Sequence, residues 1–259
     1  MKQINTYDEI SGLISVYLRK GVHTNTFLTP DVYKAEIAAG SMYAHQWQGG
    51  LLILRKRQDF CRLNYYINDL ASLPDYLPEK ATVIEIPLRP GSGTEDIDYW
   101  QRQGFNKLMS RLRLVRPGGL EAGSAGLYNI KKAAKEEIPE LGSLLESCFN
   151  PLTGCLPTTA QLKQDIESGL VFTAQDDKGI SGLLRISLGM AAAEIRQLAV
   201  REDRRGRGIA RALLLHYLKE TQYKKSLVWT GQENINAIRL YEGCGYKPDG
   251  WTSIILLKD

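Results

Sequence analysis

The sequence has little cysteine and no long apolar run. Its four cysteines are scattered over 259 residues and form no C-x-x-C pair, so nothing points to a disulfide framework, and a reducing compartment is expected. The longest apolar runs are about five residues, whereas a membrane-spanning helix needs about 18. The first residues lack the apolar core of a signal peptide. These absences predict a cytoplasmic protein without a membrane partner.

An excess of charge is missing as well. The net charge is +4, and residues 1–125 and 126–259 each carry +2, which is too little for a nucleic-acid-binding half. We therefore expect no nucleic-acid partner. The three histidines have no partners at metal-ligand spacing, so no metal site is predicted. With 43% apolar and 24% charged residues, the composition is that of a soluble protein with a packed core.

A glycine-rich stretch, VRPGGLEAGSAG, divides the chain. Such a composition is typical of a connection between domains. We predict one domain over 1–115, a linker over 116–126 and a second domain over 127–259.

The second domain has a regular alternation of strand and helix patterns. They follow the order β-α-α-β-β-β-α-β-α-β, over residues 127–133, 136–149, 159–168, 170–175, 180–189, 192–200, 209–220, 226–232, 234–245 and 251–258. This order predicts an α/β fold, with a mixed sheet and helices on its faces.

Part of this plan occurs twice. DIDYWQRQGF at 96–105 aligns with AIRLYEGCGY at 237–246 at a constant offset, and a hairpin pattern at 42–57 resembles 172–187. These matches predict two copies of one fold. The alternative is chance similarity between short hairpins.

The stretch RRGRGIARALLLHYLKE, at 204–220, carries the clearest chemistry. Six arginines lie within sixteen residues, directly before an amphipathic helix pattern, at positions Arg196, Arg201, Arg204, Arg205, Arg207 and Arg211. Glycines at a helix N-terminus allow backbone N–H groups to approach an anion. Neither a P-loop nor a dinucleotide fingerprint fits, because no Lys-Ser or Lys-Thr follows and Arg211 replaces the last glycine. The alternative is a solvated basic surface.

Two motifs connect this stretch to a known family. Arg205, Gly208 and Ala210 form R-x-x-G-x-A, which resembles the [QR]-x-x-G-x-[GA] pyrophosphate loop of the GNAT acyltransferase superfamily. About thirty residues later comes N-x-x-A-x-x-L-Y-E-x-x-G-[FY], a second motif of the family. Its residues here are Asn234, Ala237, Leu240, Tyr241, Glu242, Gly245 and Tyr246. The resemblance implies a GNAT acyl-CoA N-acyltransferase fold and two tandem GNAT-like domains.

The resemblance also implies a site for acetyl-CoA as co-substrate. The backbone of one strand would pair with the pantetheine arm, and the loop would hold the pyrophosphate. These groups are Leu198, Ala199 and Val200 for the arm, and Arg205, Gly206, Arg207, Gly208, Ile209 and Ala210 for the pyrophosphate. Asn234 and Tyr241 would face the pantetheine and its sulfur. A splay between strands 192–200 and 226–232 would admit the thioester.

Acyl transfer needs a base, an oxyanion donor and an acid. Glu194 is the candidate base, acting through water, the Leu198 N–H is the oxyanion donor that the family implies, and Tyr241 is the candidate acid. Two of the three have a plainer alternative. Glu194 could be solvated or pair with Arg196, and Tyr241 could only pack its ring.

The first half departs from the family where the loop should be. Its corresponding segment, LASLPDYLPE, has two prolines and no glycine, and Trp100 stands where the second half has Tyr241. We therefore predict a degenerate GNAT-like half without a CoA loop. Four aromatic residues could wall an acceptor pocket or be purely structural; they are Tyr65, Tyr66, Tyr99 and Trp100.

The function expected from these motifs is acetyl-CoA-dependent N-acetylation. The acceptor would be a primary amine of a small molecule or peptide, attacked directly in a ternary complex by a monomer or homodimer. A non-catalytic acyl-CoA sensor is the alternative from another class. RNA binding through the arginines is a weaker one, because no wider basic surface or interleaved aromatics accompany them.

Overall fold

The computed structural model describes residues 1–259 except 27, 122, 124–127 and 222–223. The chain divides into two compact units. Unit 1 comprises Met1–Ser110 and Thr252–Asp259, and unit 2 comprises Arg111–Trp251. Each unit has hydrophobic cores of its own. No helix among the described residues is long and apolar enough to cross a membrane.

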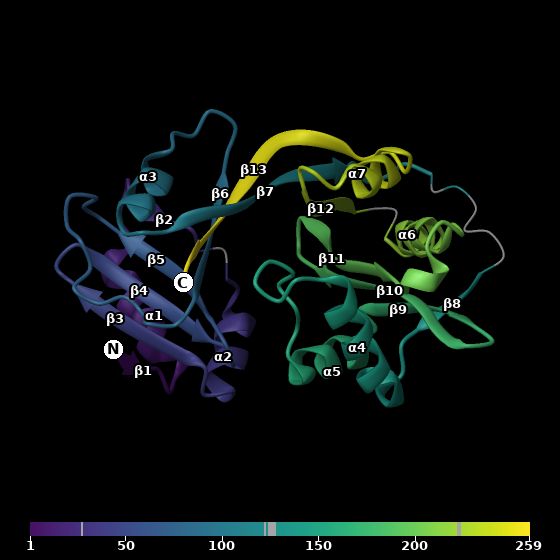
Figure 1. The fold of residues 1–259 in the computed structure, drawn as a ribbon, viewed down its shortest axis with the longest axis horizontal. Coiled ribbons are helices and arrows are strands. Elements are labelled where there is room, and N and C mark those ends of the chain that lie inside the picture. The colour runs from purple at the N-terminus through teal and green to yellow at the C-terminus, as the bar shows by residue number, and fades with distance from the viewer. Residues whose placement is uncertain (27, 122, 124–127, 222–223) are drawn as a thin grey trace. The chain divides into compact units, whose positions relative to one another are not determined.

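The second half of the chain contains the element order expected from the sequence (Figure 1). The elements are β8 (Asn129–Lys132), α4 (Ile138–Cys148), α5 (Thr159–Glu167), β9 (Val171–Asp176), β10 (Gly179–Leu188), β11 (Ala192–Val200), α6 (Ile209–Glu220), β12 (Lys225–Gly231), α7 (Ile235–Glu242) and β13, which begins at Lys247 and ends at Lys258. Single 3-10 turns, Lys135–Glu137 and Glu202–Arg204, precede α4 and α6. The sheet order is β8-β9-β10-β11-β12-β7, where β7 is Asn106–Arg116.

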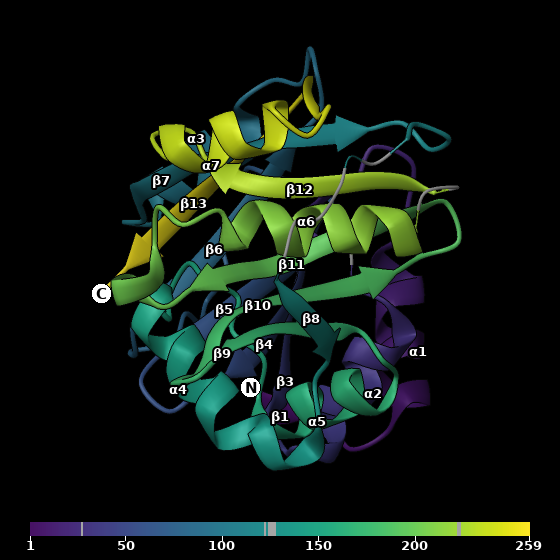
Figure 2. The same ribbon diagram turned by 90° about the vertical axis from the view of Figure 1, so that its right-hand side faces the viewer.

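The helices of unit 2 cover both faces of its sheet. One core joins α6 and α7 to the strands and includes Leu213, Tyr217 and Tyr241. The other joins α4 and α5 to β9, β10 and β11. Figure 2 shows α6 running along β11 and β12. Because the two faces are covered by different helices, side chains of β11 and β12 are sorted by their alternation into an α6/α7 face and an α4/α5 face.

Local sequence accounts for the helix ends. The Thr158 hydroxyl accepts a hydrogen bond from the Gln161 N–H, and the Gln161 side chain bonds back to the Thr158 N–H, which is a capping box for α5. Helix α7 ends at Glu242, three residues before the expected Gly245. Gly245 lies past the helix end with φ 88°, where the chain turns into β13.

Unit 1 repeats the plan with one helix missing. Its elements are β1 (Lys2–Gln3), α1 (Tyr7–Tyr17), β2 (His23–Thr24), α2 (Pro30–Ala38), β3 (Met42–Trp47), β4 (Gly50–Lys56), β5 (Cys61–Ile67), β6 (Thr82–Leu88) and α3 (Glu95–Arg102). The sheet order is β1-β3-β4-β5-β6-β13, so each of these six strands matches one in unit 2, while β2 pairs with β5 outside this order. Residues 68–81, between β5 and β6, form no helix, whereas α6 lies between β11 and β12. The structure thus shows two tandem copies of one mixed α/β fold.

The last strands of the two copies are exchanged. Residues Arg111–Arg116 of β7 pair with β12 in unit 2, and Thr252–Lys258 of β13 pair with β6 in unit 1. The domains expected from the sequence run continuously over 1–115 and 127–259, whereas each compact unit takes its final strand from the other copy. Most of the second half of the expected linker 116–126 lies outside the described residues.

Candidate active site

Strands β11 and β12 are parallel neighbours over only part of their length. Their pairing runs from Ala192 opposite Lys225 to Ile195 opposite Val228 and then stops. Beyond this point β11 continues to Val200 while β12 continues to Gly231, pairing with β7 alone on its other side. The two strands therefore part after Ile195 and Val228, which is the splay that the family resemblance implies.

The edge of β11 that faces the splay offers backbone groups for pairing. The Arg201 N–H donates to the Ser181 oxygen of β10 at 2.9 Å, and Ala199 lies opposite Leu183. Because N–H groups alternate in direction along a strand, those of Leu198 and Val200 point away from β10. Of the three residues expected to pair with the pantetheine, two thus present their amides to the splay.

The loop between β11 and α6 is shaped by two glycines. Gly206 has φ 76° and Gly208 has φ 83°, and a Cβ on either would meet open space. The first intrahelical bond of α6 runs from the Ala212 N–H to the Gly208 oxygen at 2.9 Å. The N–H groups of Ile209, Ala210 and Arg211 thus precede that bond and have no partner within the helix, which is the arrangement that favours an anion at a helix N-terminus.

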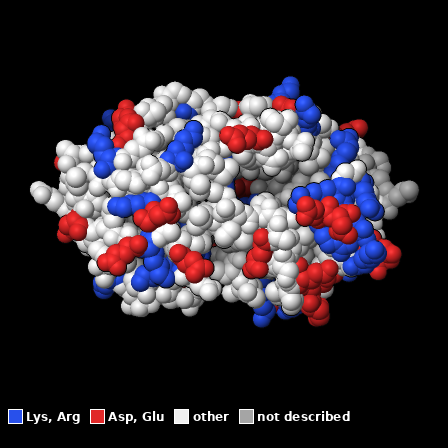
Figure 3. Space-filling model, viewed as in Figure 1, with Lys and Arg blue, Asp and Glu red and all other residues white. Residues whose placement is uncertain are grey.

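The six arginines have divided roles. Four are held by other groups of unit 2: Arg196 by Glu194 at 2.9 Å, Arg201 by Asp203 at 2.7 Å, Arg204 by Asp176 at 2.5 Å, and Arg211 by the Gly243 oxygen at 3.1 Å. Arg204 is buried and therefore anchors the loop to the β9–β10 turn. Figure 3 shows Lys and Arg mixed with Asp and Glu on the side of unit 2 where α6 lies.

The two arginines of the loop itself are exposed. The Arg205 Nε donates to the Val200 oxygen at 3.3 Å, which places this side chain at the mouth of the splay. The Arg207 oxygen accepts a hydrogen bond from the Tyr128 hydroxyl. Much of the basic cluster is thus structural, and Arg205 and Arg207 are the two of the six arginines that are exposed on the loop.

Tyr241 lies on the α6/α7 face, in the core against which Leu198 and Val200 pack. Its side chain is buried, and its ring meets that of Tyr246 edge-on with centroids 5.5 Å apart. Burial raises the pKa of Tyr241 above its ordinary value, because the charged phenolate loses solvation. The phenol therefore keeps its proton at neutral pH.

Asn234 caps the helix that carries Tyr241. Its Oδ1 accepts a hydrogen bond from the Ala237 N–H at 3.1 Å, at the start of α7. Sequence reasoning assigned Asn234 to the pantetheine, and the structure gives its side-chain oxygen this capping role.

Glu194 lies on the other face of the sheet. Its neighbours Ala193 and Ile195 belong to the α6/α7 core, so alternation directs Glu194 to the α4/α5 face. The side chain is 27% exposed and accepts a hydrogen bond from Arg196 at 2.9 Å. The ion pair with Arg196 that the sequence left open is thus present. Arg196 is the residue skipped where the β10–β11 register shifts, which makes it a bulge next to the splay.

Gln197 is a site residue that sequence reasoning missed. It is buried, and its Nε2 donates to the oxygens of Gly154 and Cys155 at 3.0 and 3.1 Å. Its Oε1 accepts from Arg185 at 2.8 Å. These bonds hold the loop between α4 and α5 against β11. The only signal was a glutamine in an otherwise apolar half-strand, which by itself does not distinguish a loop anchor from a surface residue.

Unit 1 has the same splay, but its own chain fills it. β5 and β6 pair only from Cys61 opposite Thr82 to Leu63 opposite Ile84, and β2 then pairs with β5. The buried Asn25 side chain bonds the oxygens of Leu63 and Glu85 at 3.1 and 3.0 Å and the Tyr65 N–H at 3.0 Å. The position in unit 1 that corresponds to the open edge of β11 is thus occupied by residues 23–25.

The aromatic residues expected to wall an acceptor pocket are buried in unit 1. Tyr65, Tyr99 and Trp100 are fully buried in one core, and Tyr66 is buried in the other. The hypothesis that these four residues wall an acceptor pocket is therefore wrong, and their role is structural. The rings of Tyr65, Tyr99 and Trp100 pack together in the core that contains α3, with the Trp100 centroid within 5.3 Å of those of Tyr65, Tyr99 and Phe105.

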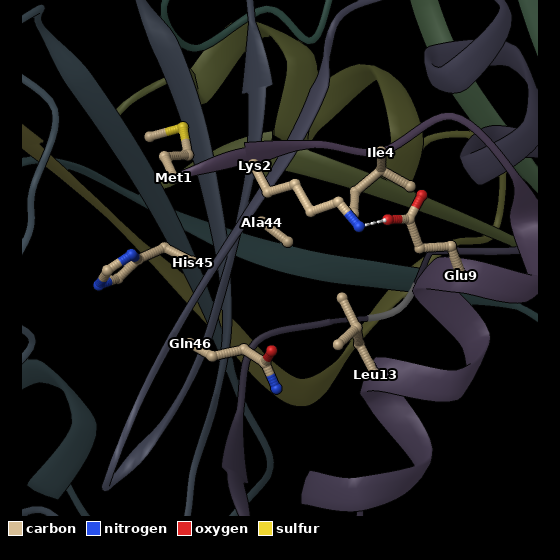
Figure 4. A pocket seen from close by; sticks show the side chains of 8 residues that line it. All are labelled: Met1, Lys2, Ile4, Glu9, Leu13, Ala44, His45 and Gln46. Atoms are coloured by element: carbon tan, nitrogen blue, oxygen red, sulfur yellow. Dashed lines mark ion pairs between the residues drawn. The ribbon is translucent and has the colours of Figure 1, made fainter.

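A cavity of about 430 Å³ lies elsewhere in unit 1, between the N-terminus, α1 and β3. Figure 4 shows Lys2 and Glu9 pointing toward each other across it, paired at 2.5 Å, and His45 pairs with Asp75 at 2.6 Å. The side chains of Lys2, Glu9 and His45 are thus already paired. In the described part of the chain, no three metal-ligating side chains gather.

Comparison with known proteins agrees with the geometry of unit 2. Residues 138–246 match the acetyltransferase (GNAT) family. None of the curated proteins matches the chain. A GCN5-related N-acetyltransferase from Sphaerobacter thermophilus is similar with a TM-score of 0.58 and 13% identity, over 99% of this chain and 94% of that one.

Two further solved structures share the fold. A GNAT-family acetyltransferase from Colwellia psychrerythraea has a TM-score of 0.58 and 14% identity, over 99% of this chain and 98% of that one. A tandem GNAT protein from the clavulanic acid biosynthesis pathway has a TM-score of 0.52 and 11% identity, over 84% and 83%. The matched residues 138–246 contain the splay, the glycine loop and Tyr241, and the protein carries a GNAT acetyltransferase domain in this region.

Proposed function

We propose that unit 2 transfers the acetyl group of acetyl-CoA to a primary amine of a small-molecule or peptide acceptor, by direct attack in a ternary complex. The observation that carries the proposal is the splay of β11 and β12 beside a glycine loop at the N-terminus of α6. A loop for an anion and a free strand edge for an amide-bearing arm are the two parts that an acyl-CoA needs.

The residues present fit acetyl-CoA as substrate. N–H groups from Gly206 to Ala210 would hold the pyrophosphate, since both glycines leave open space above the backbone, whereas the Arg205 N–H donates to the Glu202 oxygen at 3.2 Å. The amides of the pantetheine would pair with the free edge of β11 at Leu198 and Val200. This arrangement brings the thioester to the neck of the splay, next to Ile195 and Val228.

The proposed base and the proposed acid would then lie on opposite faces of the sheet. Glu194, on the α4/α5 face, would remove the proton of the attacking ammonium through water, after giving up its bond to Arg196. The Leu198 N–H would donate to the oxyanion. Tyr241, on the α6/α7 face, would protonate the departing thiolate, for which its raised pKa keeps a proton available. The amine attacks from one face and the thiolate leaves on the other.

The proposal is tested by thiol release from acetyl-CoA in the presence of a panel of primary amines. We expect at least one amine to accelerate CoA release and to gain an acetyl group, detected by mass spectrometry. Acetyl-CoA binding by calorimetry is measured in parallel. Binding without release on any amine would contradict the proposal and favour the acyl-CoA sensor.

Glu194→Gln is expected to lower kcat/KM for the amine by about a hundredfold, because an amide cannot accept the proton. The variant should also lose the acidic limb of the wild-type pH–rate profile, since a carboxylate must be ionised to act as base. The profile of kcat/KM between about pH 5 and 9 is the measurement. An acidic limb that persists in Glu194→Gln would remove Glu194 from the base role.

A further inference from the structure

Two of the four tryptophans in the sequence belong to none of the hydrophobic cores described above. Trp229 and Trp251 are both partly exposed. Large aromatic side chains kept at a surface beside a cleft are typical of binding sites, because they offer apolar area at a low cost in conformational entropy. Their surroundings therefore indicate which ligand they fit.

Trp229 lies at the point where β12 parts from β11. It is the first residue of β12 after Val228, where pairing with β11 ends. Val228 faces the α6/α7 core, so Trp229 faces the α4/α5 side, together with Glu194. In the proposed function this is the side from which the amine attacks. Trp229 thus lines the wall of the splay next to the proposed base.

Arg113 joins the two indoles. It lies opposite Trp229 on β7, and its guanidinium carbon is 4.3 Å from the Trp251 ring centre and 5.6 Å from that of Trp229. Its Nε and Nη2 donate to Asp249 at 3.0 and 2.6 Å. The ion pair thus holds both rings in place, which prepares an aromatic surface.

The charges around this surface exclude some acceptors. Asp249 neutralises Arg113, and Arg196 neutralises Glu194. A polycation finds no excess of negative charge here. A carboxylate approaching Arg113 meets Asp249 on the same guanidinium. The two indoles are therefore the groups that can bind the acceptor.

We propose that Trp229 and Trp251 form the acceptor subsite and select a monoamine with a flat, apolar or aromatic body. This inference rests on the proposed function. The ring of the acceptor lies against Trp229, and its amino group extends along β12 toward Glu194 and the neck of the splay.

The experiment compares 2-phenylethylamine, spermidine and glucosamine as acceptors. The wild type should show a kcat/KM for phenylethylamine at least about tenfold above the other two. Trp229→Ala should lower that value by about tenfold, mainly through KM, because the stacking surface is lost. Trp229→Phe should recover most of it, and acetyl-CoA affinity should hold in both variants. Equal use of the three amines, or an equal loss for all of them in Trp229→Ala, would overturn the subsite.

Binding separates this inference from the proposed function. Calorimetry of phenylethylamine with the CoA-loaded protein needs no turnover. Binding that weakens by about tenfold in Trp229→Ala supports the subsite, even if no amine is acetylated and the proposed function fails. Absence of binding at millimolar phenylethylamine overturns the subsite, even if another amine is acetylated.

Discussion

Tyr241→Phe is expected to lower kcat for acetyl transfer by about a hundredfold and to leave the affinity for acetyl-CoA unchanged. The hydroxyl is the only group removed, and the ring still fills its place beside Tyr246. Without the hydroxyl the thiolate must leave unprotonated or take a proton from water. Steady-state kinetics with a saturating amine and calorimetry with acetyl-CoA are the measurements.

The pH dependence follows from the same burial. The raised pKa of Tyr241 means that the neutral, active phenol persists above the ordinary tyrosine pKa of about 10. Wild-type kcat should therefore show no alkaline fall from this group below about pH 10. A wild-type kcat in Tyr241→Phe would remove the acid role.

Gly208→Val is the matched control, with the opposite expected effect on acetyl-CoA affinity. A φ of 83° strains a β-branched residue, so this variant should lose acetyl-CoA binding.

Asn25→Ala is expected to lower the free energy of unfolding of unit 1 by about 3 kcal/mol. The buried side chain bonds two carbonyl oxygens and one N–H at the splay of β5 and β6. Alanine leaves all three groups buried without this partner, and each such group costs about 1–3 kcal/mol. Chemical denaturation followed by tryptophan fluorescence measures the change, because Trp100 lies in the core of unit 1.

Asn68→Ala is the control for this prediction. Asn68 is exposed and follows β5 directly, so its replacement should change the unfolding free energy by less than about 0.5 kcal/mol. Similar effects of the two alanine substitutions would contradict the view that residues 23–25 close the splay of unit 1.

Local sequence patterns were sufficient to predict the elements that form the candidate site. The apolar spacing after Gly208 predicts α6, and two glycines before it predict the backbone turn, because both depend on residues close in sequence. The internal repeat predicted two copies, and the sheets of both units have matching strand orders. The absence of a glycine loop and a helix between β5 and β6 could also be predicted from the sequence, because prolines and acidic residues occupy that segment.

Contacts between residues that are distant in sequence could not be predicted from local patterns. Nothing local marks Gln197 as the anchor of the loop at Gly154 and Cys155, or the four aromatic residues of unit 1 as core rather than pocket. The alternatives for Glu194 stayed open because an ion pair depends on rotamers, which the bulge at Arg196 sets.

The sequence alone determined the order of elements, the glycine loop and the family motifs, because these follow from local periodicity and from positions that need a positive φ. The tertiary structure decided which copy each final strand joins, since β7 and β13 have similar strand patterns and only long-range pairing selects β12 or β6. It also decided that the splay of unit 1 is filled by residues 23–25, while that of unit 2 leaves the edge of β11 beyond Ile195 unpaired with β12.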